Sequence, residues 1–438
     1  MSGALHNLTY RRLLLAQIFS VLGSGLTTIA LGLLAFEMAG GQAGAVLGIA
    51  LAIKMVAYVG VAPIATTLAE RLPRKGFLIA LDLARACLVL SLPFVTEIWH
   101  IYALVFGFQA FSAGFTPTFQ ATIPDILTDE GDYTQALSYS RLTYDLEALL
   151  GPLIAGAALT VLTFNSLFVG TAIGFLLSAG LVMSVRLPRR KHVPTAAFSK
   201  RLTRGLWIYL ATPRLRGVLA LYVAVAAATA MVIVNTVVLV KDVLGQGDGL
   251  VAIFFAASGC GSMVVALALP KLLGETSPRP VMLAGGVILS FGLGVAALSD
   301  EMWVGLILWF VIGAGASLIQ TPTGLLLTWS CHSQDRPAVF AAQFALSHSA
   351  WLLAYPLAGV LGGAVGLPIT FATMAALACL ATFGAAKLWP AIDPLALEHE
   401  HDATVPPHAE GDETQTGGSY RHRHAFVIDD AHPTWPTS

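Results

Sequence analysis

Long apolar runs alternate with short polar connections along almost the whole chain. Each run is about 20 residues long, which is the length that a helix needs to cross the hydrocarbon core of a bilayer. The runs lie at residues 13–38, 45–68, 76–95, 99–119, 136–162, 167–185, 217–240, 251–269, 281–298, 302–326, 338–363 and 367–388. The pattern predicts an all-α membrane protein with twelve transmembrane helices in two six-helix pseudo-symmetric halves.

Polar segments divide the chain into four parts. We expect an N-terminal six-helix half at 1–185, a basic cytoplasmic linker at 186–216, a C-terminal six-helix half at 217–390 and a disordered tail rich in His and acidic residues at 391–438. An internal repeat supports the two halves, because a shift of 204 positions lays Pro356 on Pro152 and superimposes the fifth and eleventh runs. Paired halves with Gly- and Pro-interrupted helices in matching positions are typical of alternating-access transporters.

Composition agrees with a membrane protein. Hydrophobic residues make up 56% of the chain and charged residues only 11%, against about a quarter charged in soluble domains. Lys and Arg gather in the connections on one side, which predicts that both termini are cytoplasmic. The sequence has no nucleotide-binding loop, nucleophile constellation or catalytic metal motif, so we expect neither an enzyme nor a cofactor. It also has no basic patch with interleaved aromatics, so we expect no nucleic-acid partner.

The fifth predicted span carries three ionisable residues, Arg141, Asp145 and Glu147. A charge at that depth costs about 2.5 to 3.5 kcal/mol even by the lower estimates, so such residues usually face a bundle interior and find partners. Arg141 and Asp145 are four residues apart and can pair on one helix face. Glu147 lies on another face, which makes it the better proton carrier. Lys54 in the second span can reach either acid, unless it forms a permanent structural pair or extends to the interface.

Neutral polar residues and one histidine also fall inside predicted spans. His348, flanked by two serines in span eleven, could carry a proton or bind a metal, although a histidine bonded to a neighbouring hydroxyl is more common. Gln109, Asn235 and Gln320 are candidates for lining a substrate path, and the alternative is hydrogen bonding between helices. The candidate transport and proton-coupling residues are therefore Glu147, Asp145, Arg141, Lys54 and His348.

The connection between the second and third spans reads TTLAERLPRK at residues 66–75, and span five contains GPLIAG. Together with twelve spans and a long basic central loop, these segments resemble the major facilitator superfamily. The connection is similar to that family's G-x-x-x-D-R-x-G-R-K signature, but Thr66, Glu70 and Pro73 stand where Gly, Asp and Gly are usual.

The resemblance implies a conformational gate at this connection. An acid and three bases at a helix end could form a cytoplasmic lock that breaks when the halves rock, with a further pair one turn apart in span three completing it. The alternative is that these charges only anchor the helix ends. The gate residues would be Glu70, Arg71, Arg74, Lys75, Asp82 and Arg85.

Further segments resemble one branch of the superfamily. YRRLLLAQ near the start and FTPTFQATIPDIL before span five are similar to drug and siderophore exporters. In combination with SRLTYDLEALLGP and a histidine-bearing tail, they look most like nickel-resistance permeases. This resemblance alone implies the direction, export from a bacterial cell through its inner membrane.

The tail after residue 394 is polar and too poor in apolar residues to fold alone. It combines imidazoles with carboxylates, a mixture that suits nickel, cobalt, copper or zinc better than magnesium or calcium. A solvated acidic tail with incidental histidines is the alternative. The candidate metal ligands are His399, His401, His408, His422, His424 and His432.

Three functions compete at this stage. The first is proton-coupled efflux of a divalent metal cation such as nickel or cobalt, and the second is proton-coupled efflux of amphipathic drugs or siderophore-like organics. The third is a membrane metal sensor that transports nothing. We expect the partners to be a small-molecule or metal-ion substrate, protons and the lipid bilayer, with the protein a monomer.

Overall fold

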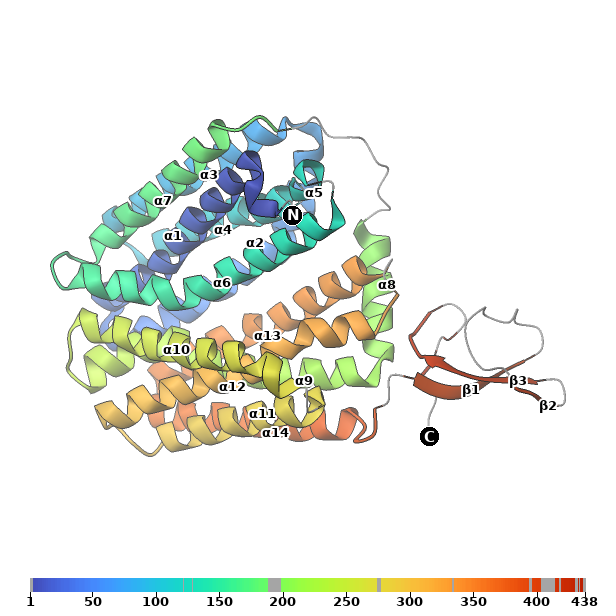
Figure 1. Ribbon diagram of the computed structural model, residues 1–438. Coiled ribbons are helices and arrows are strands. Elements are labelled where there is room, and N and C mark those ends of the chain that lie inside the picture. The colour runs from blue at the N-terminus through green and yellow to red at the C-terminus, as the bar shows by residue number, and fades with distance from the viewer. Residues whose placement is uncertain are drawn as a thin grey trace.

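The computed structural model describes residues 3–120, 122–127, 129–187, 198–273, 277–332, 335–393, 396–402, 414–416, 419–429, 432 and 434–435. Within these residues it is a bundle of long helices in two halves, with a small sheet beside one end (Figure 1). Ten stretches are long and apolar enough to cross a membrane by length and composition; the first, Leu8–Ala57, covers one helix and the start of the next. The predicted fold class is confirmed.

In its described residues the N-terminal half contains six long helices, each at a predicted span. They are α1 (Leu8–Ala39), α2 (Ala43–Arg71), α3 (Arg74–Ser91), α4 (Ile98–Gln120), α6 (Glu130–Leu159) and α7 (Asn165–Met183). A short element, η1 (Ala4–His6), precedes α1, and the connections contain η2 (Gly40–Gln42), η3 (Leu92–Phe94) and α5 (Ile123–Ile126).

The C-terminal half also has six long helices in the part that the structure describes. They are α9 (Pro213–Val238), α10 (Asp248–Leu273), α11 (Pro278–Ala296), α12 (Met302–Trp329), α13 (Arg336–Val365) and α14 (Leu367–Leu388), with a π-helical turn, η4 (Leu239–Val243), after α9. The linker adds a helix that hydropathy did not mark as a span, α8 (Phe198–Ala211). It is strongly amphipathic and packs against α13.

Local sequence signals fix several helix starts. The Asn7 side chain accepts hydrogen bonds from the backbone nitrogens of Thr9 and Tyr10 at 3.0 and 3.1 Å, which caps α1. Proline opens α9 and α11, where its missing N–H leaves no intrahelical bond unmade. Asp129 caps α6 through the Asp132 nitrogen at 2.9 Å.

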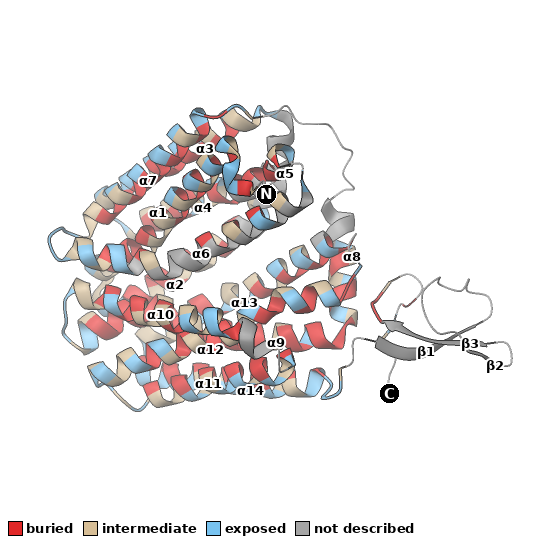
Figure 2. Ribbon diagram, viewed as in Figure 1, coloured by how far each residue is buried: buried red, intermediate tan, exposed pale blue. Residues whose placement is uncertain are grey.

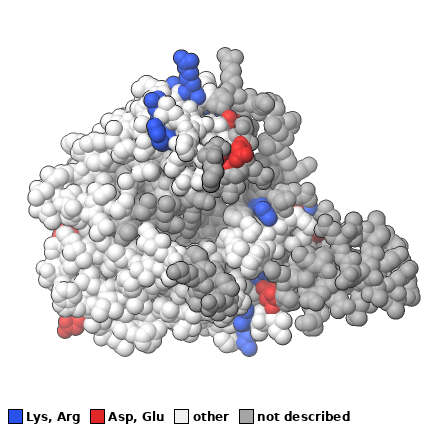
Figure 3. Space-filling view, in the orientation of Figure 1, with Lys and Arg blue, Asp and Glu red and all other residues white. Residues whose placement is uncertain are grey.

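Burial follows what a bilayer requires. Helix α9 is buried along most of its length, whereas outer helices leave large apolar side chains exposed (Figure 2). The described surface that faces the viewer in Figure 3 is mainly uncharged. An apolar exterior on long helices is what lipid contact favours, because lipid tails are as apolar as the side chains.

The halves meet at the end of the bundle opposite the chain termini, through α2 against α13 and α6 against α10. Gly44 and Gly48 of α2 face Gly359 and the Tyr355 carbonyl of α13, and we call these four residues the glycine seam. A Cβ built at Gly48 or Gly359 would lie closer than 3.0 Å to backbone oxygen, a separation that real Cβ atoms essentially never show. Small residues therefore let the two backbones touch.

Three strands form a sheet in the described part of the tail, in the order β1-β3-β2. They are β1 (Ala396–Asp402), β2 (Thr414–Thr416) and β3 (Ser419–Ala425), and both pairings are antiparallel. This differs from the disorder that low hydrophobicity predicts. The backbone register pairs the Glu398 position with the Arg423 position and the Glu400 position with the Arg421 position.

Candidate substrate-binding pocket

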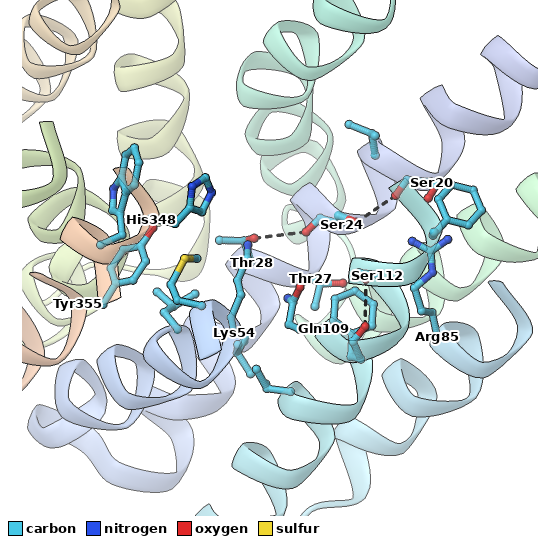
Figure 4. Close-up of a pocket in the computed structure, with 18 of the residues that line it drawn as sticks. Ser20, Ser24, Thr27, Thr28, Lys54, Arg85, Gln109, Ser112, His348 and Tyr355 are labelled. Carbon is cyan, nitrogen blue, oxygen red and sulfur yellow. Dashed lines mark hydrogen bonds between the residues drawn. The ribbon is translucent and has the colours of Figure 1, made fainter. Parts of the chain in front are cut away.

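A cavity of about 450 Å³ lies between the two halves. Helices α1, α2, α3 and α4 line it from the N-terminal half, and α12 and α13 from the C-terminal half (Figure 4). Its polar lining residues are Gln17, Ser20, Ser24, Thr27, Thr28, Lys54, Arg85, Gln109, Ser112, Gln320, His348, Trp351 and Tyr355. Apolar side chains such as Leu51, Met55 and Phe108 complete the wall.

Hydroxyl groups on α1 form one polar stripe in this wall. Ser24 donates to the Ser20 carbonyl at 3.1 Å, and Thr28 donates to the Ser24 carbonyl at 3.3 Å. On α4, Ser112 donates to the Phe108 carbonyl at 2.9 Å. Each hydroxyl proton is thus used within its own helix, which leaves oxygen lone pairs to accept from a ligand. The sequence does contain a signal for this stripe, because Ser20, Ser24 and Thr28 recur every four residues in an otherwise apolar helix.

The predicted path residues separate into two groups. Gln109 and Gln320 line the cavity, as the hypothesis requires. Asn235 does not line it: the residue is 1% exposed, and its Nδ2 donates to the Ala358 carbonyl at 3.0 Å. Asn235 therefore joins α9 to α13 beside the glycine seam, which is the alternative that the sequence left open.

His348 lies in the cavity wall on α13. Its Nδ1 is 2.7 Å from the Phe344 carbonyl oxygen, and its ring stacks on Phe344 at 3.8 Å between centroids. A carbonyl only accepts, so we assign the proton to Nδ1, and Nε2 of the neutral ring then presents a lone pair. The same imidazole lies 5.5 Å from the Trp351 ring, whose Nε1 donates to Thr229 at 2.8 Å.

Asp82 and Arg85 form a buried ion pair within the N-terminal half, and Arg85 also lines the cavity. Ser178 donates to Asp82 at 2.8 Å, while the Arg85 guanidinium lies 4.2 Å from the Phe115 ring and 4.4 Å from the Phe175 ring. The structure thus places this pair away from the helix-end gate that we expected. The reason is geometric: eight residues into α3, Asp82 is about 12 Å from the helix start.

The remaining gate candidates lie at the start of α3 and the end of α2. Arg74 forms a salt bridge with Asp125 of α5, a residue of the same half. Lys75 is partly exposed. The side chains of Glu70 and Arg71 lie outside the described part of the structure.

For most of the other predicted site residues, the structure describes the backbone but not the side chain. Arg141, Asp145 and Glu147 belong to α6, but their side chains are outside the described part. The same holds for His399, His401, His422 and His424 of the tail strands, and His408 is outside altogether. His432 is described and buried. Lys54 of α2 lines the cavity.

The long helices, the two halves and the cavity between them match one transporter family. Residues 13–328 match the sequence model of the Major Facilitator Superfamily. The chain belongs to that superfamily. It is therefore a multi-pass membrane transporter and not an enzyme.

Individual relatives agree with this assignment. The chain is 26% identical over 322 residues to an uncharacterized MFS-type transporter, YfiS, of Bacillus subtilis (strain 168), covering 70% of this chain and 76% of the relative. The crystal structure of a mutant of the nucleoside transporter NupG shares the fold with a TM-score of 0.72 at 12% identity, over 87% of this chain and all of that one. A structure of a bacterial metal transporter shares it with a TM-score of 0.62 at 12% identity, over 87% and 98%. At such identities these structures show the fold alone.

Proposed function

We propose that this member of the superfamily is a proton-coupled exporter of a small organic substrate, which binds in the cavity between the halves. The observation that carries the proposal is the described lining: amides, hydroxyls, a phenol, two cations and aromatic rings surround about 450 Å³. Such a wall suits an amphipathic molecule with several oxygen acceptors, because a few placed polar groups orient a ligand whose body contacts apolar surface. This is the drug or siderophore-like class of substrate.

A bare divalent cation fits the same wall less well. Among the described lining residues, His348 is the only imidazole, and none is a carboxylate or a thiol. Within the described part of the chain, no group of three His, Cys, Asp or Glu residues could hold a metal ion. Nickel or cobalt therefore enters this proposal as the centre of an organic chelate, whose outer surface is what the cavity contacts.

We propose that His348 and the carboxylates of α6 carry the coupled proton. When Nε2 gains a proton, the His348 ring changes from a hydrogen-bond acceptor into a cation. The new charge lies in the wall of the cavity that Lys54 also lines (Figure 4). Protonation and a ligand that donates to Nε2 then exclude each other, which is what antiport requires. Glu147 and Asp145 complete the proposed set of proton carriers, because a charge inside the membrane is costly and protonation removes it. Arg141 is the proposed partner of ionised Asp145, four positions away on the same helix.

The proposed orientation puts the termini in the cytoplasm of a bacterial cell, with the protein a monomer in the inner membrane. The orientation is supported by the Lys and Arg residues, which gather in the connections on the same side of the bundle as the chain termini. Since the halves touch at the opposite end, the cavity would then open to the cytoplasm. The proposed gate, Glu70, Arg71, Arg74 and Lys75, lies at that cytoplasmic end.

A second candidate is efflux of the metal cation itself, with the tail as its collector. The register of β1 and β3 favours it, because His399 of β1 lies opposite His422 of β3. Two positions further along, β1 carries His401 and β3 carries His424. Alternate strand positions share a face, so four histidine positions fall on one face of the ladder. His408 and His432 would be further ligands, and a tail that binds metal without transport would be a sensor.

Transport into proteoliposomes separates these functions. We expect an imposed proton gradient to drive uptake of dyes or macrolides, or of a metal chelate, and the Gln109→Ala variant to raise KM about fivefold, as loss of one ligand hydrogen bond should. Gln246→Ala, in a connection at the far end, is the matched control and should behave as wild type. Uptake of free nickel or cobalt that exceeds uptake of every organic would reject the organic substrate. Gradient-independent accumulation of all of them would reject transport by proton coupling.

Deletion of residues 394–438 tests the metal candidate separately. Cells that express the shortened chain should lose nickel and cobalt tolerance if the tail collects the cation. Unchanged metal tolerance, with organic export intact, would leave the organic substrate as the remaining function.

A further inference from the structure

The segment after the tail strands returns to the helical bundle. Phe426, Val427 and Ile428 are 2%, 7% and 1% exposed, and Phe426 and Ile428 belong to the apolar core of the molecule. The Trp435 ring lies 5.1 Å from the Phe426 ring in an edge-to-face arrangement and packs against the same core. Such burial is unexpected in a chain whose tail composition predicts disorder.

One buried arginine holds both ends of the tail. Arg214, at the start of α9, has a side chain only 1% exposed, and its guanidinium nitrogen lies 3.1 Å from Asp393 just before β1. The same guanidinium lies 5.2 Å from the centre of the Trp435 ring, a cation–π arrangement. Asp393 also accepts a hydrogen bond from Trp389 Nε1 at 2.8 Å. The tail is therefore a loop closed at Arg214.

A carboxylate joins the returning segment to the connection between α12 and α13. Asp429 Oδ2 lies 3.0 Å from His332 Nε2, and Asp429 Oδ1 lies 2.9 Å from His432 Nδ1. The His432 backbone nitrogen also donates to Oδ1 at 2.7 Å. One carboxylate thus bonds a residue of the bundle and a residue of the segment that docks on it.

The linker helix is fixed to the same connection. Arg204 of α8 binds both oxygens of Asp335, at 2.6 and 3.2 Å, directly before α13 begins. Tyr209 donates to Gln343 of α13. The ends of α9, α12 and α13 therefore form one surface, on which the linker and the C-terminal segment both dock.

We propose that the returning segment is a C-terminal latch that docks on the C-terminal half. The latch consists of Phe426, Val427, Ile428, Asp429, His432 and Trp435. Its binding surface is the one formed by the ends of α9, α12 and α13. Among its described partners outside the tail are Arg214, by a cation–π contact, and His332, by a polar one, and both belong to that half. The latch makes the tail ladder move with the C-terminal half during transport. The ladder keeps its distance to α13 and changes its distance to α3 and α7 whenever the halves rock.

Limited proteolysis of the full-length protein tests whether the latch is closed. Wild type should be cut slowly within residues 419–429, and Asp429→Asn and Trp435→Ala should each be cut about tenfold faster there, the change expected for losing one charge-assisted contact. Asp300→Asn, an exposed carboxylate at the opposite end, is the matched control and should be cut like wild type. Equal cleavage of wild type and both latch variants would overturn the proposal.

Two further measurements are independent of any variant's folding. Excess synthetic peptide FVIDDAHPTW should displace the segment and accelerate cleavage of the wild-type tail, whereas the peptide with both substitutions should not. Spin labels at Thr416 and Val365 should keep one distance while labels at Thr416 and Ser91 change theirs when a proton gradient is imposed. A constant Thr416–Ser91 distance with a changing Thr416–Val365 distance would refute it. Each result holds whatever the substrate is.

Discussion

The glycine seam makes the closed end of the transporter sensitive to a single methyl group. In Gly48→Ala, the new Cβ would overlap the Tyr355 carbonyl oxygen and lie 3.1 Å from the carbonyl carbon and 3.4 Å from Gly359 Cα. All three neighbours are backbone atoms, which cannot rotate aside. Closure therefore requires α2 and α13 to separate by several tenths of an ångström or more.

That separation has an energetic cost only in the state that closes this end. Overpacking of a tight interface costs about 1 to 3 kcal/mol, and 2 kcal/mol changes the ratio of the two states about 30-fold. The opposite state, in which the seam is apart, gains no such strain. We expect Gly48→Ala to shift the population toward that state and to slow transport while folding remains intact.

Thiol labelling measures the shift. A cysteine at Thr28 in the cavity, in a chain without the four native cysteines, should become accessible to an impermeant reagent from the far side of the membrane in Gly48→Ala. Gly60→Ala on the same helix is the control, since no described atom lies within 4 Å of a Cβ built there. Labelling that is the same in Gly48→Ala, Gly60→Ala and wild type would refute the argument that the seam is the closed gate.

Other features predict further outcomes. Asp82→Asn removes the negative charge of a buried ion pair, so the unfolding free energy should fall by about 3 kcal/mol, measured as a lower Tm in detergent; an unchanged Tm would contradict the pair's structural role. Burial raises the pKa of Asp429, but hydrogen bonds from His332 and His432 outweigh it and lower the pKa to about 2. Because a carboxylate with a lowered pKa stabilises docking above its ordinary value near 3.8 and stops doing so as pH falls through the lowered one, tail cleavage by an acid-active protease should change little between pH 7 and 5 and accelerate between pH 4 and 2. Cleavage that accelerates above pH 5 would show that another group controls the latch. Pro356→Ala restores a backbone N–H inside α13 and should slow transport by stiffening the helix, measured as a lower kcat at unchanged KM.

The helices could be predicted from sequence because a bilayer imposes a simple rule. Twenty apolar residues in a row satisfy their backbone only as a helix, so each predicted span coincides with a long helix, to within a few residues. Part of the cavity lining could be predicted for the same reason. Polar residues stand out in apolar runs, and four that do so line the cavity: Gln109, Gln320, His348 and Lys54.

Features that depend on contacts between segments far apart in the sequence could not be predicted from it. Asp82 and Arg85 resemble helix-end charges in sequence, and only the fold shows that Ser178 and two phenylalanine rings enclose them. Asn235 looks the same as Gln109 until the position of Ala358 is known. The latch was hidden because composition averages over the tail, whereas a few apolar residues, Phe426 to Ile428 and Trp435, are enough to dock it.

Helix α13 links the cavity to the closed end. Tyr355 belongs to both, since its side chain lines the cavity while its carbonyl faces Gly48 across the seam. His348 lies eleven positions before Gly359, about 16 Å along the helix. A ligand or proton at His348 that tilts α13 must therefore displace the seam, unless the helix bends between them. Pro356 lies at that point and leaves the Leu352 carbonyl without its usual helical donor, so it sets how much of the tilt is transmitted.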